Sequence, residues 1–364
     1  MLYQIALTKI HGVGTALGRQ LFTYFGSAEA IFKEKERLLE KIPGIGTRTA
    51  LEIKNPEVLE QAEAELAFMG KNRIKGLFIN DEQYPYRLRE CPDAPLLLYT
   101  KGNIDLNKTH IVSIVGTRNA TSYGRELTEQ FVADLGAAIP DVLIISGLAF
   151  GIDICSHRAA LKNKLSTVGV LAHGLDRIYP GVHKSTAIAM LEQGGLLTDY
   201  PSGTNPDRSN FVRRNRIVAG LADATIVVES AEKGGSLITA DLAFSYSRDV
   251  FSFPGRTNDP MSCGCNKLIR LNKAGLISCA TDFISAMCWE ERKQPDSVQA
   301  ELPFSTVEEC SDPVLALIRK QGDIQIDELA IRLEIAISEL SVHLFELEME
   351  GKIKAIPGGR YRPT

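Results

Sequence analysis

Residue types that bind phosphate recur in this 364-residue sequence, in short segments that follow apolar runs. The clearest segment is Gly116-Thr117-Arg118, directly after the β-branched run IVSIV at residues 111–115. A glycine lets the backbone turn sharply after a buried strand, and a following helix offers unpaired N–H groups to an anion. The arginine at this point indicates a phosphate ligand; an arginine that only pairs at the sheet edge is the alternative.

Four further segments carry the same residue types. They are Ser146-Gly147 with Phe150, Arg177 with Tyr179 and Lys184, Arg213-Arg214-Asn215-Arg216, and Gly234-Gly235-Ser236. Each segment alone has a structural explanation; the arginine cluster, for example, would suit a solvated helix face. Together they indicate a phosphate-rich ligand, and cations interleaved with aromatic rings suit a phosphate chain with exposed bases.

Groups that could perform catalysis are scarce. His157 lies one turn after Asp153, and the two could form a catalytic pair, but we favour an internal contact between positions i and i+4. The seven cysteines are scattered and contain no C-x-x-C; Cys263-Gly-Cys265 has no second pair to complete a metal site. We find no nucleophile–base pair and no paired carboxylates, so we expect a binding protein without enzymatic activity, metal or cofactor.

Alternating apolar and amphipathic runs predict the elements that position these loops. Strands are expected at 111–115, 142–146, 167–172, 195–198, 224–229 and 250–253, with helices at 123–138, 153–162, 184–193, 210–221 and 236–245. Repeated strand–helix units of this length predict an α/β fold, a Rossmann-like, doubly wound and mostly parallel sheet. Neither a G-x-x-x-x-G-K-[ST] segment nor a G-x-G-x-x-G after a strand is present, which excludes the usual P-loop and dinucleotide motifs.

Smaller regions flank this sheet. Residues 1–70 contain two similar segments, IHGVG and IPGIG, each followed by a helical run, which predicts a helix–hairpin–helix (SAM-like) domain. Such hairpins can offer N–H groups to DNA phosphates or can only pack against neighbours. Residues 71–110 read as loops plus one strand at 96–99, so the central domain is predicted to span 71–288.

The C-terminal part divides into a linker and a small domain. Residues 289–312 are polar and are expected to be a linker, and residues 313–364 carry three helical runs and a hairpin tail typical of a winged helix. Its third run, 338–349, holds Glu339, Glu346 and Glu348 and no lysine or arginine. Carboxylates would repel phosphates, so we favour a protein-contact or packing role for this helix.

Bulk composition sets further limits. The chain is 44% hydrophobic and 24% charged with a net charge of −4, so a nucleic-acid site would have to be a local basic patch. No run reaches the roughly 18–20 apolar residues that span a bilayer, and the first residues do not resemble a signal peptide. We expect a cytoplasmic protein with no membrane contact.

The motifs IVGTR, SGLAFGID, GLDRIYP, RRNRIVAGL, GGSLITA and GCNKLI occur in this order across residues 111–277. This series resembles the family of DNA-processing protein A, the DprA/Smf family. The resemblance implies a protein that binds single-stranded DNA, protects incoming strands during natural transformation and loads the RecA recombinase onto them. It also implies a pocket around Arg118 and a homodimer formed through the late part of the central domain, here around Asn266, Leu268, Ile269 and Leu276.

Our expected single-stranded-DNA contacts combine the family pocket with the segments above. The set is Gly116, Thr117, Arg118, Ser146, Gly147, Phe150, Arg177, Tyr179, Lys184, Arg213, Arg214, Asn215, Arg216, Gly234, Gly235 and Ser236. The chain departs from the family pattern at Phe150, where an arginine is usual, at Val212, where a proline is usual, and at residues 271–275.

Two other functions remain possible from the sequence. A nucleotide-binding or nucleotide-processing enzyme could use the same Rossmann-like core, as the lysine-decarboxylase-like phosphoribohydrolases do. Those enzymes need a glutamate in a P-G-G-x-G-T-x-x-E motif, and none follows Gly234-Gly235-Ser236 at that spacing. The other possibility is a scaffold in which the winged helix docks a recombinase and DNA contact is incidental.

Overall fold

The computed structural model describes residues 1–289 and 312–364. The chain forms two compact units, Met1–Ser278 and Cys279–Thr364. Apart from its end residues 289 and 312, the linker expected at 289–312 lies outside the described residues. The domain boundaries at residues 70 and 288 stay predictions.

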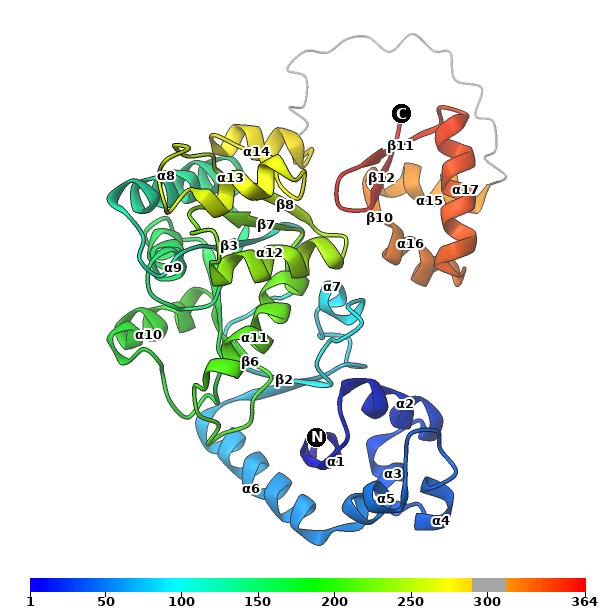
Figure 1. Ribbon diagram of the computed structural model, residues 1–364. Helices are drawn as coiled ribbons and strands as arrows, with labels where there is room; N and C mark the ends of the chain where they lie inside the picture. The colour runs from blue at the N-terminus through cyan, green and yellow to red at the C-terminus, as the bar shows by residue number, and fades with distance from the viewer. Residues whose placement is uncertain (290–311) are drawn as a thin grey trace. The chain divides into compact units, whose positions relative to one another are not determined.

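A nine-stranded sheet organises the first unit (Figure 1). Its strand order is β1-β2-β6-β5-β4-β3-β7-β8-β9, parallel from β6 to β9, with β1–β2 and β2–β6 antiparallel. The strands are β1 Lys75–Phe78, β2 Leu97–Gly102, β3 Ile111–Val115, β4 Leu143–Ser146, β5 Ser166–Val170, β6 Gly195–Thr198, β7 Ala224–Val227, β8 Asp249–Ser252 and β9 Gly275–Leu276. The chain runs outward from β3 to β6 and then returns to place β7 beside β3, so the sheet is doubly wound with its switch point between β3 and β7.

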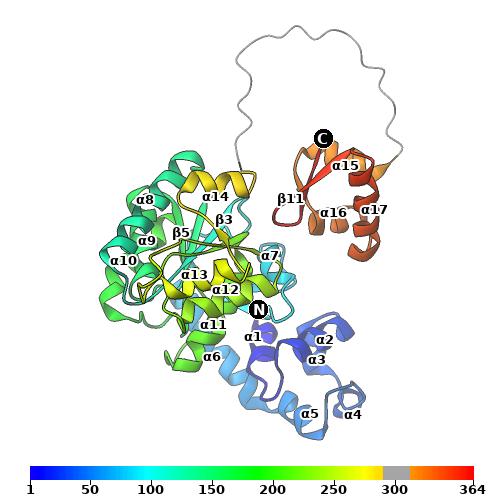
Figure 2. The same cartoon turned by 45° about the horizontal axis from the view of Figure 1, so that its top comes forward.

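Helices cover both faces of this sheet. In both views α8, α9 and α10 lie together, while α11 and α12 pack against each other (Figures 1 and 2). Their bounds are α8 Ser122–Ala138, α9 Ile152–Lys162, α10 Lys184–Gln193, α11 Arg208–Leu221 and α12 Gly235–Ser245. Coverage of both faces explains why β3, β4 and β7 are apolar runs without alternation and are buried along their whole length.

The predicted doubly wound fold is confirmed, and each of its six predicted strands lies within two residues of an observed one. The bridge before it was predicted incompletely. It contains two strands, because the KGLF segment of β1 pairs with β2, and a short helix, α7 Tyr86–Arg89. β1 is short, half-buried and contains a glycine, so no apolar run marks it.

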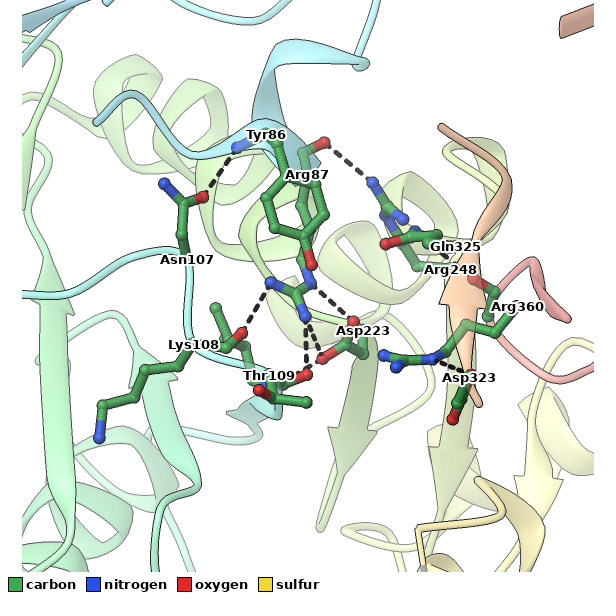
Figure 3. A network of polar contacts seen from close by, with 12 residues as sticks. Tyr86, Arg87, Asn107, Lys108, Thr109, Asp223, Arg248, Asp323, Gln325 and Arg360 are labelled. Carbon is green, nitrogen blue, oxygen red and sulfur yellow. Dashed lines mark hydrogen bonds and ion pairs between the residues drawn. The ribbon is translucent and has the colours of Figure 1, made fainter. Parts of the chain in front are cut away.

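A buried ion pair fixes this bridge to the sheet (Figure 3). The Arg87 guanidinium is fully buried and donates to both carboxylate oxygens of Asp223, at 2.6 and 3.0 Å, and to two carbonyl oxygens of residues 108 and 109. Asp223 also accepts the N–H of Ile111, the first residue of β3. A buried charge needs such partners, so this network ties α7 to the starts of β3 and β7.

The N-terminal helices form the predicted tandem of hairpins. They are α1 Leu2–Lys9, α2 Thr15–Phe25, α3 Ala28–Lys33, α4 Glu36–Leu39, α5 Thr47–Lys54 and α6 Pro56–Asn72. Gly12 and Gly44 have φ of +85° and +88°, the left-handed conformation that the tight turns before α2 and α5 require.

Two contacts join these helices to the central sheet. Glu65 of α6 accepts the N–H and the hydroxyl of Ser202, at 2.9 and 2.7 Å. Arg19 donates to the carbonyls of Arg89 and Cys91, both at 3.2 Å. Arg19, one of the few basic residues near the hairpins, is therefore engaged in holding the domain in place.

The second unit contains a winged helix. Helices α15 Pro313–Gln321, α16 Ile326–Leu333 and α17 Ile337–Met349 enclose a core of Leu315, Ile318, Leu340 and Leu344. Strands β10 Ile324–Gln325, β11 Ile353–Ile356 and β12 Arg360–Pro363 form its sheet in the order β10-β12-β11. The unit also includes α14 Ala280–Ala286, and the remaining helix, α13 Cys263–Arg270, belongs to the first unit.

No helix within residues 1–289 and 312–364 combines the length and the apolar character needed to cross a lipid bilayer.

Candidate functional site

A cleft of about 570 Å³ opens at the carboxyl ends of β3 and β7, the switch point of the sheet. Ligands of doubly wound sheets bind at this position because adjacent loops diverge there. The loops after β3, β4, β5 and β7 contribute to its walls, as does α11. Of the predicted contact residues, it is lined by Gly116, Thr117, Arg118, Gly147, Tyr179, Arg214, Asn215, Gly234, Gly235 and Ser236.

A cation and two aromatic rings occupy one wall. The guanidinium carbon of Arg118 lies 5.2 Å from the centre of the Phe211 ring, a cation–π contact that leaves the arginine exposed. The Tyr179 ring is 48% exposed, and its centre lies 5.9 Å from that of Phe211. Positive charge and exposed π-surface are therefore combined within one cleft.

The N-terminus of α12 contributes backbone N–H groups to the cleft rather than side chains. Gly234 precedes the helix, and Gly235 and Ser236 begin it. The first N–H groups of a helix lack intrahelical partners and carry partial positive charge. The Ser236 hydroxyl is buried and donates to Ser230 at 2.9 Å, so this segment offers N–H groups to a ligand rather than side chains.

Arg214 forms the floor of the cleft. It is buried, its Nη1 donates to the carbonyl of Val170 at 2.5 Å, and its guanidinium lies where a Cβ at residue 147 would collide with it. A side chain at residue 147 would therefore have to displace the Arg214 guanidinium. Burial lowers the pKa of Arg214, whereas the nearby Asp153 carboxylate favours its charged form. Arg214 therefore supports the loop after β4.

Asp153 is the one carboxylate that lines the cleft in the described part of the chain. It accepts the N–H groups of Gly147 and Ala149, at 3.1 and 3.4 Å. Burial raises its pKa, and Arg214 together with these two hydrogen bonds opposes that rise. Its Oδ2 atom accepts both hydrogen bonds and so holds the loop, and the side chain is only 8% exposed, so Asp153 does not present an exposed general base at this place.

The expected pairing of Asp153 with His157 is wrong in both of its forms. The His157 ring is buried, and its Nδ1 lies 2.7 Å from the hydroxyl of Thr167 instead. Burial lowers the pKa of His157 to about 3, so the ring is neutral. In residues 1–289 and 312–364, no three histidine, cysteine, aspartate or glutamate side chains are grouped closely enough to hold a metal ion.

Two expected contact residues are directed into the protein. Ser146 is fully buried in β4, and its hydroxyl donates to the carbonyl of Ile114 at 2.6 Å. Arg216 is paired with Asp199 at 2.5 Å and donates to the carbonyl of Asp93. The structure corrects both assignments, because these side chains are engaged away from the cleft.

Four other expected residues lie outside the lining. Phe150 is 47% exposed and packs edge-on against His183, with ring centres 4.9 Å apart. Arg177 bonds Asp176 at 2.8 Å and Asn205 at 2.7 Å. Lys184, at the start of α10, and Arg213, on α11, are both exposed. The loops that border the cleft contain Phe150 and Arg177, and Lys184 begins the helix that follows one of these loops. A longer ligand could therefore reach all three side chains.

The cationic and aromatic lining residues that the expected set missed are Arg208, Phe211 and Lys233. A usable signal existed for two of them. Arg208, Phe211 and Asn215 follow helical spacing of i, i+3 and i+7, which places them on one face of α11.

The expected dimer residues have different environments. Leu268 is buried in the core, and the Asn266 amide bonds the backbone of Gly255. Ile269 is half-buried. Leu276, on the edge strand β9, is 56% exposed. Of this set, Leu276 thus presents the exposed apolar surface.

Comparisons with known proteins agree with this architecture. A family model described as DNA recombination-mediator protein A matches residues 75–288. A SAM-like helix-hairpin-helix tandem matches residues 5–55, and a DprA winged helix domain matches residues 298–359.

Relatives match over most of the chain. Protein Smf of Synechocystis is 30% identical over 99% of this chain and 98% of its own length, and protein Smf of Escherichia coli is 34% identical over 78% and 76%. The X-ray structure of DNA processing protein A from Streptococcus pneumoniae covers 78% of this chain and 97% of that one, with 31% identity and a TM-score of 0.63.

A second solved structure concerns the single-stranded DNA binding mode of DNA processing protein A from Helicobacter pylori. It is 29% identical, has a TM-score of 0.54 and covers 60% of this chain and 96% of that one. The family model alone covers more than half of the present sequence. The chain therefore belongs to the family of DNA recombination-mediator protein A, the DprA/Smf family.

Proposed function

We propose that this protein binds single-stranded DNA in the cleft at the carboxyl ends of β3 and β7 and acts in DNA uptake and recombination. The observation that carries the proposal is the combination of Arg118, the N-terminus of α12 and two aromatic rings in one cleft. Arg118 and the N–H groups of α12 would neutralise backbone phosphates. Phe211 and Tyr179 would stack bases, which stabilises binding by ~1–3 kcal/mol per base and tolerates any sequence.

This arrangement favours single strands over duplex DNA, because paired bases are not available to stack on a protein ring. The net charge of −4 adds no general attraction for nucleic acid, so the affinity must come from local cations. Lys233 and Arg208, which line the cleft, and Arg177 and Lys184 near its border would extend the basic track.

The competing enzymatic function has less support. A nucleotide-processing enzyme needs a free acid or base beside its ligand. In this cleft Asp153 is bonded to two N–H groups. Glu229, just after β7, does not line the cleft and accepts the hydroxyl and the N–H of Thr121 at 2.5 and 3.0 Å. We therefore propose binding without catalysis, metal or cofactor.

We further propose, on the basis of family membership, that the protein is a cytoplasmic homodimer. It would protect incoming strands and load the RecA recombinase onto them. The exposed leucine on β9 supports the dimer. RecA loading rests on the family alone, and the acidic third helix of the winged helix suits a protein partner better than DNA.

A salt titration of oligonucleotide binding tests the proposal. Wild type and Arg118→Ala are titrated with a labelled single strand and with the matching duplex. Wild type should prefer the single strand, and Arg118→Ala should weaken binding and reduce the slope of log K against log [salt] by about 0.7, the value for one lost phosphate contact.

The control is Lys162→Ala. Lys162 is exposed and ends α9, so it lies near the amino ends of the strands, away from the cleft. Equal binding of single strand and duplex, or equal slopes in all three proteins, would contradict the proposal. Mononucleotides would then be screened as ligands of the same cleft.

A further inference from the structure

A second cleft of about 740 Å³ lies at the carboxyl end of β8, two strands from β3 in the sheet. It is lined by Thr121 and Tyr123 at the start of α8 and by the loop that follows β8: Pro254, Gly255, Arg256, Asn258, Asp259 and Ser262. The first cleft is lined by residues 115–118 of the same connection between β3 and α8. The two clefts therefore share one connecting segment.

The loop after β8 is held in a fixed conformation. Gly255 donates its N–H to the Asn266 side chain at 3.1 Å and accepts from the same amide at 3.0 Å. A Cβ at residue 255 would collide with the Ser262 hydroxyl, so the turn is closely packed. Asn266 thus fixes the residue that precedes Arg256, and its expected place at a dimer interface stays a prediction.

The acidic residue of this loop is engaged internally. Asp259 accepts the Ser262 hydroxyl at 2.7 Å and the N–H of Met261 at 3.0 Å, and these hydrogen bonds lower the pKa of its carboxyl. The Arg256 guanidinium is exposed and donates no hydrogen bond within the described part of the chain. A rigid loop thus presents one cation to the cleft.

An exposed ring faces the same space. Tyr123 lines the cleft from the first turn of α8, and its side chain is 55% exposed. A guanidinium and an accessible aromatic ring in one cleft are the two groups that bind a nucleotide of a single strand, through its phosphate and its base.

We propose that this second cleft binds the nucleotides that continue beyond the first cleft on the same strand, with Arg256 at a phosphate and Tyr123 stacked on a base. The strand would pass over the exposed residue Asn119, which lies in the chain between Arg118 of the first cleft and Thr121 of the second. This inference rests on the proposed function, because it extends the same binding track.

The test measures affinity as a function of strand length. Fluorescently labelled oligothymidylates, lengthened one nucleotide at a time, are titrated into wild type, Arg256→Ala, Tyr123→Ala, Arg118→Ala and the control Lys162→Ala. The shortest oligonucleotides, which fill only the first cleft, should bind wild type, Arg256→Ala and Tyr123→Ala equally.

Beyond a threshold length the variants should separate. Wild type should gain affinity with each added nucleotide, whereas Tyr123→Ala should bind roughly five- to 150-fold more weakly. Arg256→Ala should show a salt slope smaller by about 0.7. Both side chains are exposed, so thermal unfolding should be the same as in wild type.

The outcomes separate the two proposals. If Arg118→Ala weakens binding at every length while Arg256→Ala and Tyr123→Ala match Lys162→Ala throughout, the second cleft is not part of the track and this inference is overturned. If Arg118→Ala also matches the control, the first cleft fails and the extension fails with it. Equal losses at the shortest lengths would also overturn the inference, because the residues would then not act downstream of the first cleft.

Discussion

His157, one of three buried histidines in the described part of the chain, makes the stability of the fold depend on pH. His157 on α9 faces the Thr167 hydroxyl, and Arg214 and His183 are close enough to disfavour a charge on its ring. Burial is the larger effect, and together they lower its pKa to about 3. The unfolded chain has a histidine pKa near 6.5. As the pH falls from about 6.5 towards 3, the unfolded state binds a proton that the native state does not bind. The free energy of unfolding therefore decreases.

Replacing His157 should reduce this dependence, while His173, whose pKa burial also lowers, keeps its own contribution. We expect wild type to lose up to about 2 kcal/mol more than His157→Gln between pH 7 and pH 5, since one pKa unit corresponds to about 1.4 kcal/mol. Urea unfolding at the two pH values measures the difference. His11→Gln is the matched control, because His11 is exposed in the first hairpin. Equal pH dependence of wild type and His157→Gln would contradict the assignment.

The three arginines of the 213–216 cluster show what the sequence could and could not predict for single residues. Its density indicated an anionic ligand, yet Arg213 is exposed, Arg214 is buried under the cleft and Arg216 is paired with Asp199. Composition alone does not resolve these environments, because they depend on which face of α11 meets the sheet. Helical spacing from Asn215 would have selected Phe211 and Arg208 for the cleft.

At the scale of elements, the N-terminus of α12 is the feature that a single substitution can test. Gly235 has open space around its Cα, so an aspartate fits there without displacing a neighbour. A carboxylate in the first turn stabilises a helix by about 0.3–1 kcal/mol, while it would repel a phosphate at the same place. Gly235→Asp should therefore keep or raise thermal stability and lose affinity for single-stranded DNA.

Another helix provides a control for this prediction. Gly46 precedes α5 in the second hairpin and also has open space around it, but it lies outside the cleft. Gly46→Asp should leave DNA affinity unchanged in a binding titration. A similar loss in both variants would mean that the hairpins also contact DNA, and no loss in Gly235→Asp would remove α12 from the site.

Elements with a strong local pattern were predictable, and elements defined by their partners were not. The Val/Ile-rich run of β3 and the helical spacing of α10 predicted bounds that match the structure to the residue. β1 and β9 were missed because they are short and exist through pairing with β2 and β8. The second cleft was missed for the same reason, since the start of α8 and the loop after β8 are far apart in sequence.

At the scale of the whole molecule, the β9 edge of the sheet is the surface through which two copies of the chain could associate. β9 is a two-residue edge strand paired with β8, and Leu276 on it and Leu271 before it are 56% and 52% exposed. Exposed apolar residues at a sheet edge favour association with another chain. The proposed homodimer would cover them and place two clefts within reach of one strand.

Disrupting this edge should therefore affect assembly and long-strand binding together. We expect Leu276→Glu to shift the protein towards monomer in sedimentation experiments, whereas Leu51→Glu, at a 53% exposed leucine of α5, should not.

The affinity of Leu276→Glu for a strand that is long enough to reach both clefts of a dimer should be lower than that of wild type, because the second binding event is no longer intramolecular. Strands that fill one cleft should bind Leu276→Glu as they bind wild type, since Leu276 does not line the cleft. An unchanged dimer would move the interface elsewhere, and a monomer with undiminished long-strand affinity would show that one subunit carries the whole binding track.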